Sequence, residues 1–186
     1  VHMGVCADRC AEKYHFTREQ QDDFAVASYQ RARTAIAGGV MAKEIVPVTV
    51  KSGKTTMQFA EDEGPNRFDE QKMRQLNPAF GDQGTTTAAN ASSLNDGAAA
   101  VVVTSAAKAM SLGIQPTAKI LGYATSSREP EWFTLAPIGA VKKLLEQLKM
   151  KVADVDLFEI NEAFSAVAMA ARKDWSIPHE KVNVLG

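Results

Sequence analysis

Residues 85–103 read TTTAANASSLNDGAAAVVV, so a loop of small residues, a turn and an apolar run follow one another directly. Small residues let a backbone approach a ligand or an ion closely, and Asn90 and Ser92 supply short hydrogen-bonding side chains. The NDG in the middle is a turn signal, because Asp-Gly tolerates positive φ. The run at 98–103 lacks polar alternation, which is typical of a strand covered on both faces. The pattern alone predicts a turn that enters a core strand of a parallel or mixed sheet.

Two further motifs stand in register with this stretch. The chain opens with HMG at residues 2–4, followed shortly by CAD, and NEAF occupies residues 161–164. In order, spacing and wording, these motifs and ANASSLNDGAAA at residues 89–100 resemble the thiolase family, and the resemblance covers the whole chain. Within the family, the wording is most similar to the members that make or cleave acetoacetyl-CoA. The resemblance implies an α/β fold with the layered α-β-α-β-α architecture of thiolases.

The same resemblance divides the chain into three parts. Residues 1–94 correspond to most of a CoA-binding loop domain, and residues 95–116 correspond to the end of an N-terminal core domain. Residues 117–186 correspond to the first part of a C-terminal core domain, which we expect to be truncated.

Local patterns predict the elements within these parts. Thr17 and Gln20 form a capping-box signature, and apolar residues at near-helical spacing then run to Gly38-Gly39, which predicts a helix over 18–37. Alternation around Ser52-Gly53-Lys54 predicts a hairpin with strands at 44–51 and 55–61. Further strands are expected at 98–104, 118–126, 155–160 and 182–185, and further helices at 105–112, 139–148 and 163–175. Strands and helices that alternate in this way are typical of a parallel or mixed sheet covered by helices.

Composition argues against several classes of partner. The 186 residues are 45% hydrophobic, which is enough to bury a sizeable core in one domain or two small ones. A formal net charge of −1 supplies no basic surface for nucleic acid. No apolar run approaches the roughly 20 residues that span a bilayer, and no signal-peptide pattern opens the chain. We therefore expect no membrane partner and a cytoplasmic protein, or a mitochondrial one if a transit peptide lies upstream.

Cys6 and Cys10, the two cysteines of the sequence, lie four residues apart on one face of an expected helix. This spacing disfavours a structural disulfide, and zinc would need further cysteines or a paired histidine. We interpret both as reduced residues of an intracellular protein. Neither lies in the motif that carries the thiolase nucleophile, so neither is expected to be that nucleophile.

The polar run EDEGPNRFDEQKMRQL at residues 61–76 allows two interpretations. By pattern alone it is a short solvated helix of mixed charge. Alternatively, Arg67 and Lys72 supply cations to the phosphates of a nucleotide, while Phe68 offers its ring to the adenine. The resemblance favours the second interpretation. It implies CoA or substrate contacts at Arg67, Phe68, Asp69, Lys72 and Ser92, and also at Met3 of HMG and Phe164 of NEAF.

Tyr29 lies on the same expected helix face as Phe24, where its simplest role is that of a half-buried aromatic with its hydroxyl at the rim. The resemblance adds a contact with CoA and with a potassium ion. Backbone groups of Ala88, Ala89 and Ala91 would complete that ion site, since carbonyl oxygens suit a hard monovalent cation. The resemblance implies no other cofactor.

Asn161, the first residue of NEAF, is the catalytic candidate. It stands where a strand is expected to end and a helix to begin, and asparagine is among the best N-cap residues. Position alone therefore indicates a helix cap. The resemblance implies another role, in which this asparagine holds a water that donates to the thioester or enolate oxygen in one of two oxyanion holes.

Three motifs that thiolases need do not occur in the sequence. They carry the acylated cysteine, the GHP histidine that lowers the pKa of that cysteine, and a second cysteine that acts as base. His15 in KYHF and His179 in PHEK are interpreted as surface residues that do not replace the GHP histidine. By resemblance, the first motif would precede Val1 and the histidine motif would follow Gly186. We therefore expect an internal fragment of a thiolase, without turnover of its own.

For the complete enzyme the resemblance implies acetyl-CoA C-acetyltransferase activity in a homo-oligomer, a dimer or a tetramer. Two acetyl-CoA would condense to acetoacetyl-CoA and CoA, or the reverse thiolysis would run, with CoA thioesters as the substrates and no redox cofactor. Three alternatives remain open. A longer-chain 3-ketoacyl-CoA thiolase would differ at pocket residues, for which Trp132 and Phe133 are candidates. A noncatalytic relative would bind acyl chains or lipids, and a structural module would bind no CoA.

Overall fold

The computed structural model describes residues 1–186, apart from the side chain of Ser52. Two helices open the chain, α1 (Met3–Tyr14) and α2 (Arg18–Ala37). The expected capping box is confirmed, because the Thr17 hydroxyl accepts from the Gln20 N–H and the Gln20 side chain accepts from the Thr17 N–H. α2 ends before Gly38, and Gly39 follows with a φ of 68°, a value that favours glycine.

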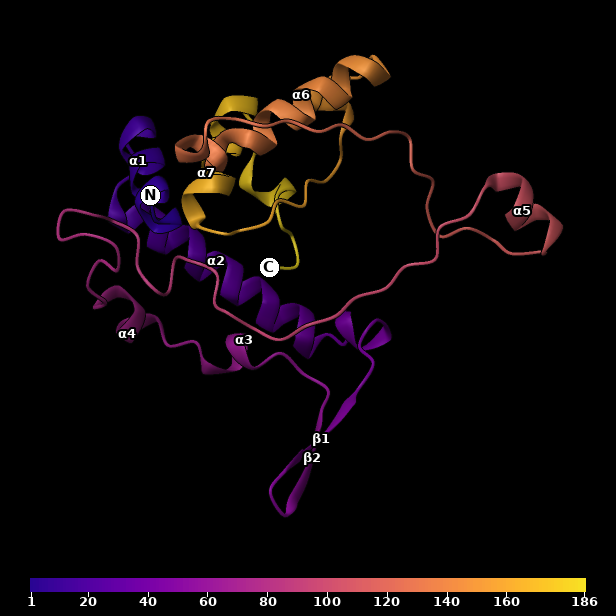
Figure 1. Ribbon diagram of the computed structural model, residues 1–186, viewed down its shortest axis with the longest axis horizontal. Coiled ribbons are helices and arrows are strands. Elements are labelled where there is room, and N and C mark those ends of the chain that lie inside the picture. Colours follow the sequence, from indigo (N-terminus) through magenta and orange to yellow (C-terminus); the bar gives the residue numbers. More distant parts are fainter.

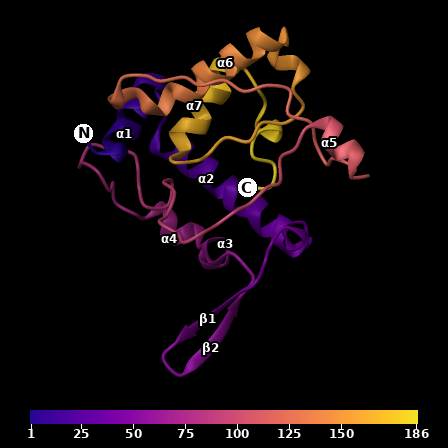
Figure 2. The same cartoon turned by 45° about the vertical axis from the view of Figure 1, so that its right-hand side comes forward.

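The core forms where α1 and α2 meet α7 (Ser165–Trp175) and the 3-10 helix η2 (Pro130–Leu135). Figures 1 and 2 show α7 lying against α1 and α2, with α6 (Ala136–Leu148) beside it. α7 buries a run of small residues, and Ala166, Ala168 and Ala170 expose none of their surface. A helix that is apolar nearly all round must be covered on most sides, so α7 is the central element of the core.

A β-hairpin stands apart from this core. β1 (Val48–Ser52) pairs antiparallel with β2 (Thr55–Phe59), with Val50 opposite Met57, and Gly53 turns between them with a φ of 61°. The expected hairpin is therefore confirmed, with each strand shorter than predicted. Both views show it extending away from the helices (Figures 1 and 2). The short helices that flank it are η1 (Met41–Lys43), α3 (Glu63–Arg67) and α4 (Glu70–Arg74).

The strands expected at residues 98–104 and 118–126 are wrong for this structure, in which neither stretch is assigned to a strand. Val101 and Val102 are 87% and 97% exposed, and Ile120 is 68% exposed. Strand hydrogen bonds form between segments, and no described segment pairs with these two. Figure 1 shows a long excursion from the helical body that carries α5 (Ala106–Ser111), after which the chain returns along α6, where Lys143 donates to the Thr125 carbonyl at 3.0 Å.

Residues 155–160 and 182–185 make one parallel contact in place of two full strands. Phe158 and Val182 form an isolated parallel bridge, so the expectation of two strands is wrong in extent. The Phe158 N–H donates to the Lys181 carbonyl at 2.8 Å, and its carbonyl accepts from the Asn183 N–H at 2.9 Å. Val182 exposes none of its surface, so this contact lies within the core. The 3-10 helices η3 (Val152–Asp154) and η4 (His179–Lys181) adjoin the two segments.

The remaining predicted helices are confirmed with shifted ends. α5 follows Ser105, whose hydroxyl accepts from the Lys108 N–H, and Gly113 lies beyond its end with a φ of 66°. α6 begins at Ala136 and not at residue 139, because Pro137 suits the first turn of a helix. No helix among the described residues is long and apolar enough to cross a lipid bilayer.

Candidate functional site

The ANASS loop and the NEAF motif, far apart in the sequence, lie side by side in the fold. Ala91 and Phe164 form an antiparallel bridge, in which the Ser92 N–H donates to the Ala163 carbonyl at 3.0 Å. Backbone bonds therefore fix the spacing between the two motifs. They bring Ser92 and Phe164, two of the predicted contact residues, to the same place.

The HMG motif reaches the same place through aromatic contacts. The His2 ring stacks on Phe80 with centroids 4.7 Å apart, and Phe80 meets Phe164 edge to face at 6.2 Å. A Cβ atom on Gly4 would collide with the Phe80 ring, so the glycine of HMG is required by packing. Met3 is 62% exposed beside this aromatic row, while Phe164 is buried. The three motifs thus form one site, with Met3 as its accessible apolar side chain.

Asp8 of α1 supports the loop that precedes ANASS. Its carboxylate oxygen Oδ1 accepts from the backbone N–H of Thr85 at 2.9 Å and from that of Thr86 at 2.8 Å. A helix side chain thereby satisfies two loop donors that would otherwise be unpaired. The charge of the carboxylate strengthens both bonds.

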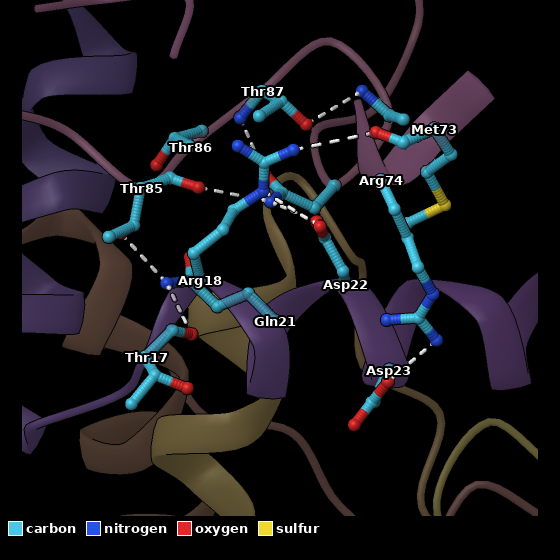
Figure 3. A network of polar contacts seen from close by, with 12 residues as sticks. Thr17, Arg18, Gln21, Asp22, Asp23, Met73, Arg74, Thr85, Thr86 and Thr87 are labelled. Atoms are coloured by element: carbon cyan, nitrogen blue, oxygen red, sulfur yellow. Dashed lines mark hydrogen bonds and ion pairs between the residues drawn. The ribbon is translucent and has the colours of Figure 1, made fainter. Parts of the chain in front are cut away.

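A buried ion pair on α2 holds the same loop from the other side (Figure 3). Arg18 donates to Asp22 at 2.7 Å, and the other Asp22 oxygen accepts from the Asn90 side chain at 3.0 Å. The Asn90 Oδ1 accepts from the Thr87 N–H at 2.8 Å, and the Asn90 carbonyl accepts from the Ser165 N–H at 2.9 Å. Asn90 therefore links α2, the loop and the first residue of α7.

Asn161 is not the cap of the helix that follows it, so the helix-cap interpretation is wrong. α7 begins at Ser165, its N-cap position is Phe164, and no side chain caps it. Asn161 is exposed and forms no hydrogen bond with another described residue. Its amide is therefore free to bind a water or a ligand oxygen beside the bridged motifs.

The aromatic candidates for CoA contact pack on one another. The rings of Tyr29 and Phe68 stack with centroids 4.6 Å apart and planes 9° apart, and the guanidinium of Arg33 lies 5.1 Å from the Phe68 centroid. Arg33 also donates to the carbonyls of Pro65 and Phe68 at 2.6 and 2.7 Å. The loop that carries Phe68 is thus fastened to α2, and an adenine would have to share the Phe68 ring with these neighbours.

The charged candidates lie at the surface next to this stack. Arg67 pairs with Glu63 at 2.7 Å and Lys72 pairs with Asp69 at 3.2 Å, with 75% and 83% of the two cationic side chains exposed. Asp69 also accepts from the backbone N–H of Lys72 as the N-cap of α4. This hydrogen bond lowers the pKa of the Asp69 carboxyl. Exposed ion pairs are weak, so both cations can exchange their partners for phosphate.

The residues predicted to hold potassium lie near this stack. Ala89 and Phe68 pack against Ala25, Val26 and Met73 in one apolar cluster, and Tyr29 stacks on Phe68. No hydrogen bond from a described residue reaches the carbonyl oxygens of Ala88, Ala89 or Ala91. Free carbonyl oxygens are suitable ligands for a hard monovalent cation, so the donor set fits the predicted ion.

His15 lies at the surface as expected, but His179 does not. His15 ends α1 in the left-handed conformation and is exposed. His179 is half-buried and stacks on Phe24 with centroids 4.9 Å apart. Burial, and after it the positive charges of Arg31 and Arg172, lower the pKa of His179 to about 4. The imidazole is therefore neutral at pH 7 and belongs to the packing between α2 and η4.

Both cysteines are free and buried in α1. The Cys6 thiol lies 3.9 Å from the Pro130 carbonyl, and the Cys10 thiol lies 3.8 Å from the Ala166 carbonyl. Burial raises the pKa of the Cys10 thiol. A buried thiol of raised pKa is a poor nucleophile, in agreement with the sequence interpretation.

Among the supporting residues, Asn90 is predicted from the sequence to supply a short hydrogen-bonding side chain, whereas no role is predicted for Asp8, Asp22 or Phe80. Only Asp22 carries a recognisable signal, because Arg18 precedes it by one helical turn. For Asp8 and Phe80, and for the bond from Asn90 to Asp22, the partner lies far away in the chain, so no local pattern points to the contact.

Comparisons with known proteins agree with this geometry. The family described as "Thiolase, N-terminal domain" matches residues 1–107, and "Thiolase, C-terminal domain" matches residues 114–186. Acetyl-CoA acetyltransferase 2 of Arabidopsis thaliana is 48% identical over 99% of this chain and 46% of its own length. A probable acetyl-CoA acetyltransferase of Dictyostelium discoideum is 48% identical over 99% of this chain and 45% of its own length.

Solved structures give the same result. The acetyl-CoA acetyltransferase of Bacillus anthracis matches with a TM-score of 0.96 and 41% identity, over 100% of this chain and 48% of that one. The Acat5 thiolase from Ascaris suum, solved in complex with coenzyme A, matches with a TM-score of 0.91 and 42% identity, over 99% of this chain and 47% of that one. The expected fold class is therefore confirmed, and the chain spans about half the length of the relatives it matches.

Proposed function

Because this chain belongs to the thiolase family, we propose that it supplies the CoA-binding surface and one oxyanion hole of an acetyl-CoA C-acetyltransferase. The whole protein would condense two acetyl-CoA to acetoacetyl-CoA and CoA, or run the reverse thiolysis. The names of the matched relatives support this choice of substrate. The observation that carries the proposal is the free, exposed amide of Asn161 beside the bridged ANASS and NEAF motifs.

The reaction makes a specific demand on that amide. A cysteine thiolate takes an acetyl group from one acetyl-CoA and releases CoA, and a base removes a proton from the methyl of a second acetyl-CoA. The resulting carbanion attacks the acyl carbon and expels the cysteine. Negative charge collects on the thioester oxygen as the proton leaves, so a fixed donor there lowers the barrier. Asn161 would hold the donating water, and no change of redox state is involved.

The CoA end of the substrate would lie along the loop fastened to α2. Arg67 and Lys72 would bind phosphates with their exposed cationic groups, and Phe68 and Tyr29 would offer aromatic surface to the nucleotide. The remaining proposed contacts are Asp69, Ser92, Met3 and Phe164. Potassium, bound through Tyr29 and the carbonyls of Ala88, Ala89 and Ala91, would order the loop beneath the CoA.

A chimera tests this function, in which the present chain replaces its counterpart in the Arabidopsis acetyl-CoA acetyltransferase 2. We expect the chimera to cleave acetoacetyl-CoA. Arg67→Glu or Lys72→Glu should each raise KM for CoA about tenfold and leave kcat nearly unchanged, because a charge-assisted bond is lost in ground and transition state alike. Lys54→Glu, the same charge change in the hairpin turn, is the control.

Two results would count against the proposal. A folded chimera without thiolysis would remove the proposed activity, and an unchanged KM in both glutamate variants would return Arg67 and Lys72 to a solvated surface. Assembly as a dimer or tetramer, and a cytoplasmic or mitochondrial location, stay predictions of the resemblance.

A further inference from the structure

Asn183 is a buried polar residue outside every motif discussed so far. It is 4% exposed, and its φ of 47° lies in the left-handed region. Its side chain forms three hydrogen bonds. Oδ1 accepts from the Ile160 N–H at 2.7 Å, and Nδ2 donates to the Ile160 carbonyl at 2.8 Å and to the Glu162 carboxylate at 2.6 Å. These partners are the residues directly before and after Asn161.

The two bonds to Ile160 continue a strand contact with a side chain. Phe158 pairs with Val182 through the backbone, and one rung further along, Ile160 pairs with the Asn183 amide. An asparagine amide carries a donor and an acceptor, as a peptide group does, so it can satisfy both backbone groups of one residue. No apolar residue and no carboxylate can do so. The Asn183 side chain therefore holds the segment before Asn161 at a point where the backbone pairing between Phe158 and Val182 has already ended.

Asn183 is itself fixed from the outside by Arg31 of α2. The Arg31 guanidinium donates to the carbonyls of Val182, Asn183 and His179 at 2.7, 3.2 and 3.1 Å. Three carbonyls on one cation hold the left-handed turn at Asn183 in shape. The side-chain amide of Asn183 then has a defined position relative to α2 and to the bridged motifs.

We propose that Asn183 is the positioning residue for Asn161. It holds the backbone of Ile160 before Asn161 and the side chain of Glu162 after it, so that the amide of Asn161 holds its water where the oxyanion develops. The inference rests on the proposed function, in which Asn161 acts in an oxyanion hole. Oxyanion donors work because they are held in place before the reaction, and a displacement of about 1 Å can cost about a hundredfold in rate. Asn183 itself touches no substrate.

The test uses the chimera with Asn183→Asp and Asn183→Gly. Asp keeps one acceptor but loses both donors and adds a charge beside Glu162, whereas Gly removes all three bonds and accepts the positive φ without strain. We expect both variants to lower kcat about ten- to a hundredfold, with KM for CoA changed less than twofold. Val182→Ala is the control, because it opens a core cavity next to the same bridge and should lower thermal stability without lowering kcat.

A double variant separates positioning from general loss of structure. If Asn183 acts through Asn161, Asn161→Ala with Asn183→Gly should be no slower than Asn161→Ala alone. Three results would overturn the inference. The double variant could lose kcat by the product of the two single losses, or Asn183→Gly could keep a kcat within twofold of the unmodified chimera. The third is a loss of kcat in Val182→Ala equal to that in Asn183→Gly. If Asn161→Ala itself keeps full kcat, the proposed function fails first. A loss in Asn161→Ala without any loss in Asn183→Gly defeats this inference alone.

Discussion

Among single residues, Asn161 shows how the observed start of a helix changes the interpretation of a sequence position. From the sequence, its best-supported local role was a helix cap. In the structure, α7 starts at Ser165, four residues later, and no side chain caps the N-terminal end of this helix. An exposed asparagine without hydrogen-bond partners contributes little to folding, so the proposed role of Asn161 in the oxyanion hole can be tested without a large loss of stability.

The first prediction separates catalysis from stability at this residue. Asn161→Asp in the chimera should lower kcat ten- to about a thousandfold, because it places a negative charge beside a developing one. The melting temperature should change little, since no folded-state contact of the side chain is lost. Asn95→Asp, at an exposed position after the ANASS loop where the structure assigns no turn, is the control for adding a charge. Near-native turnover in Asn161→Asp would remove the residue from the mechanism.

The second prediction concerns His179. Its folded-state pKa is about 4, below the ordinary value of 6.5, because of burial and of nearby Arg31 and Arg172. Between these values the unfolded chain binds more protons than the folded chain, so stability is present above pH 6.5 and is lost as pH falls toward 4. Thermal unfolding of the 186-residue chain should show this loss, and His179→Gln should weaken it. His15→Gln, at an exposed site, is the matched control for replacing a histidine by glutamine.

If the stability of the native chain and that of His179→Gln fall equally as the pH is lowered, this account of the histidine is contradicted. The half-exposed position makes the expected effect smaller than the pKa difference alone suggests, because solvent screens part of the charge. The test is therefore the difference in the pH dependence of stability between His179→Gln and His15→Gln.

At the scale of the element, α2 fastens three separate segments. Asp22 reaches the ANASS loop through Asn90, Arg33 holds the loop that carries Phe68, and Arg31 holds the turn of Asn183. The capping box and the absence of Pro or Gly inside residues 18–37 explain why this helix is long and regular enough to do so. Side chains on one continuous helix keep fixed positions relative to one another, so α2 fixes the positions of all three segments, including those proposed to bind CoA and to form the oxyanion hole.

The third prediction compares two neighbouring aspartates of α2, only one of which fastens the ANASS loop. Asp22→Ala removes a buried carboxylate and leaves Arg18 and Asn90 without their partner, which should lower the free energy of unfolding by about 3 kcal/mol. Asp23→Ala removes an exposed ion pair with Arg74 and should cost less than about 1 kcal/mol. Urea denaturation of both variants gives the two values. Equal losses would show that the Asp22 network adds nothing beyond a surface pair.

At the scale of the whole molecule, the chain combines a well-packed helical body with an apolar excursion that is not packed. Val101, Val102 and Val103 are 87%, 97% and 69% exposed, and Ile120, Leu121 and Tyr123 are exposed as well. Figure 1 shows α5 and the segments on either side of it extending away from the helical body. Consecutive exposed apolar residues of high strand propensity are ready partners for another copy of the same segment.

The fourth prediction follows from that exposure. The 186-residue chain should self-associate at micromolar concentration, and Val101→Lys with Val102→Lys should shift it toward the monomer in light scattering. Val46→Lys is the control, since Val46 is 81% exposed but lies before the hairpin, outside this run. A monomeric unmodified chain, or equal effects of the two changes, would contradict association through residues 101–103.

The sequence by itself determined the local elements and the family. The capping box at Thr17, the turn at Gly53 and the apolar run after NEAF each depend on neighbours within a few residues, and α2, the hairpin and α7 form where they were expected. The three motifs also identified the fold class, which the structural matches confirm. Such features are encoded locally, so a single sequence is enough to find them.

Only the tertiary structure decided the strands and the supporting contacts. Residues 98–103 have the composition of a buried strand, but pairing is a property of two segments, and no described segment pairs with them. Likewise, the proposed role of Asn183 depends on its hydrogen bonds with Ile160 and Glu162, which lie 23 and 21 residues away in the sequence. A hydrogen bond between distant residues leaves no periodicity in either stretch, and for that physical reason it becomes visible only when the chain has folded.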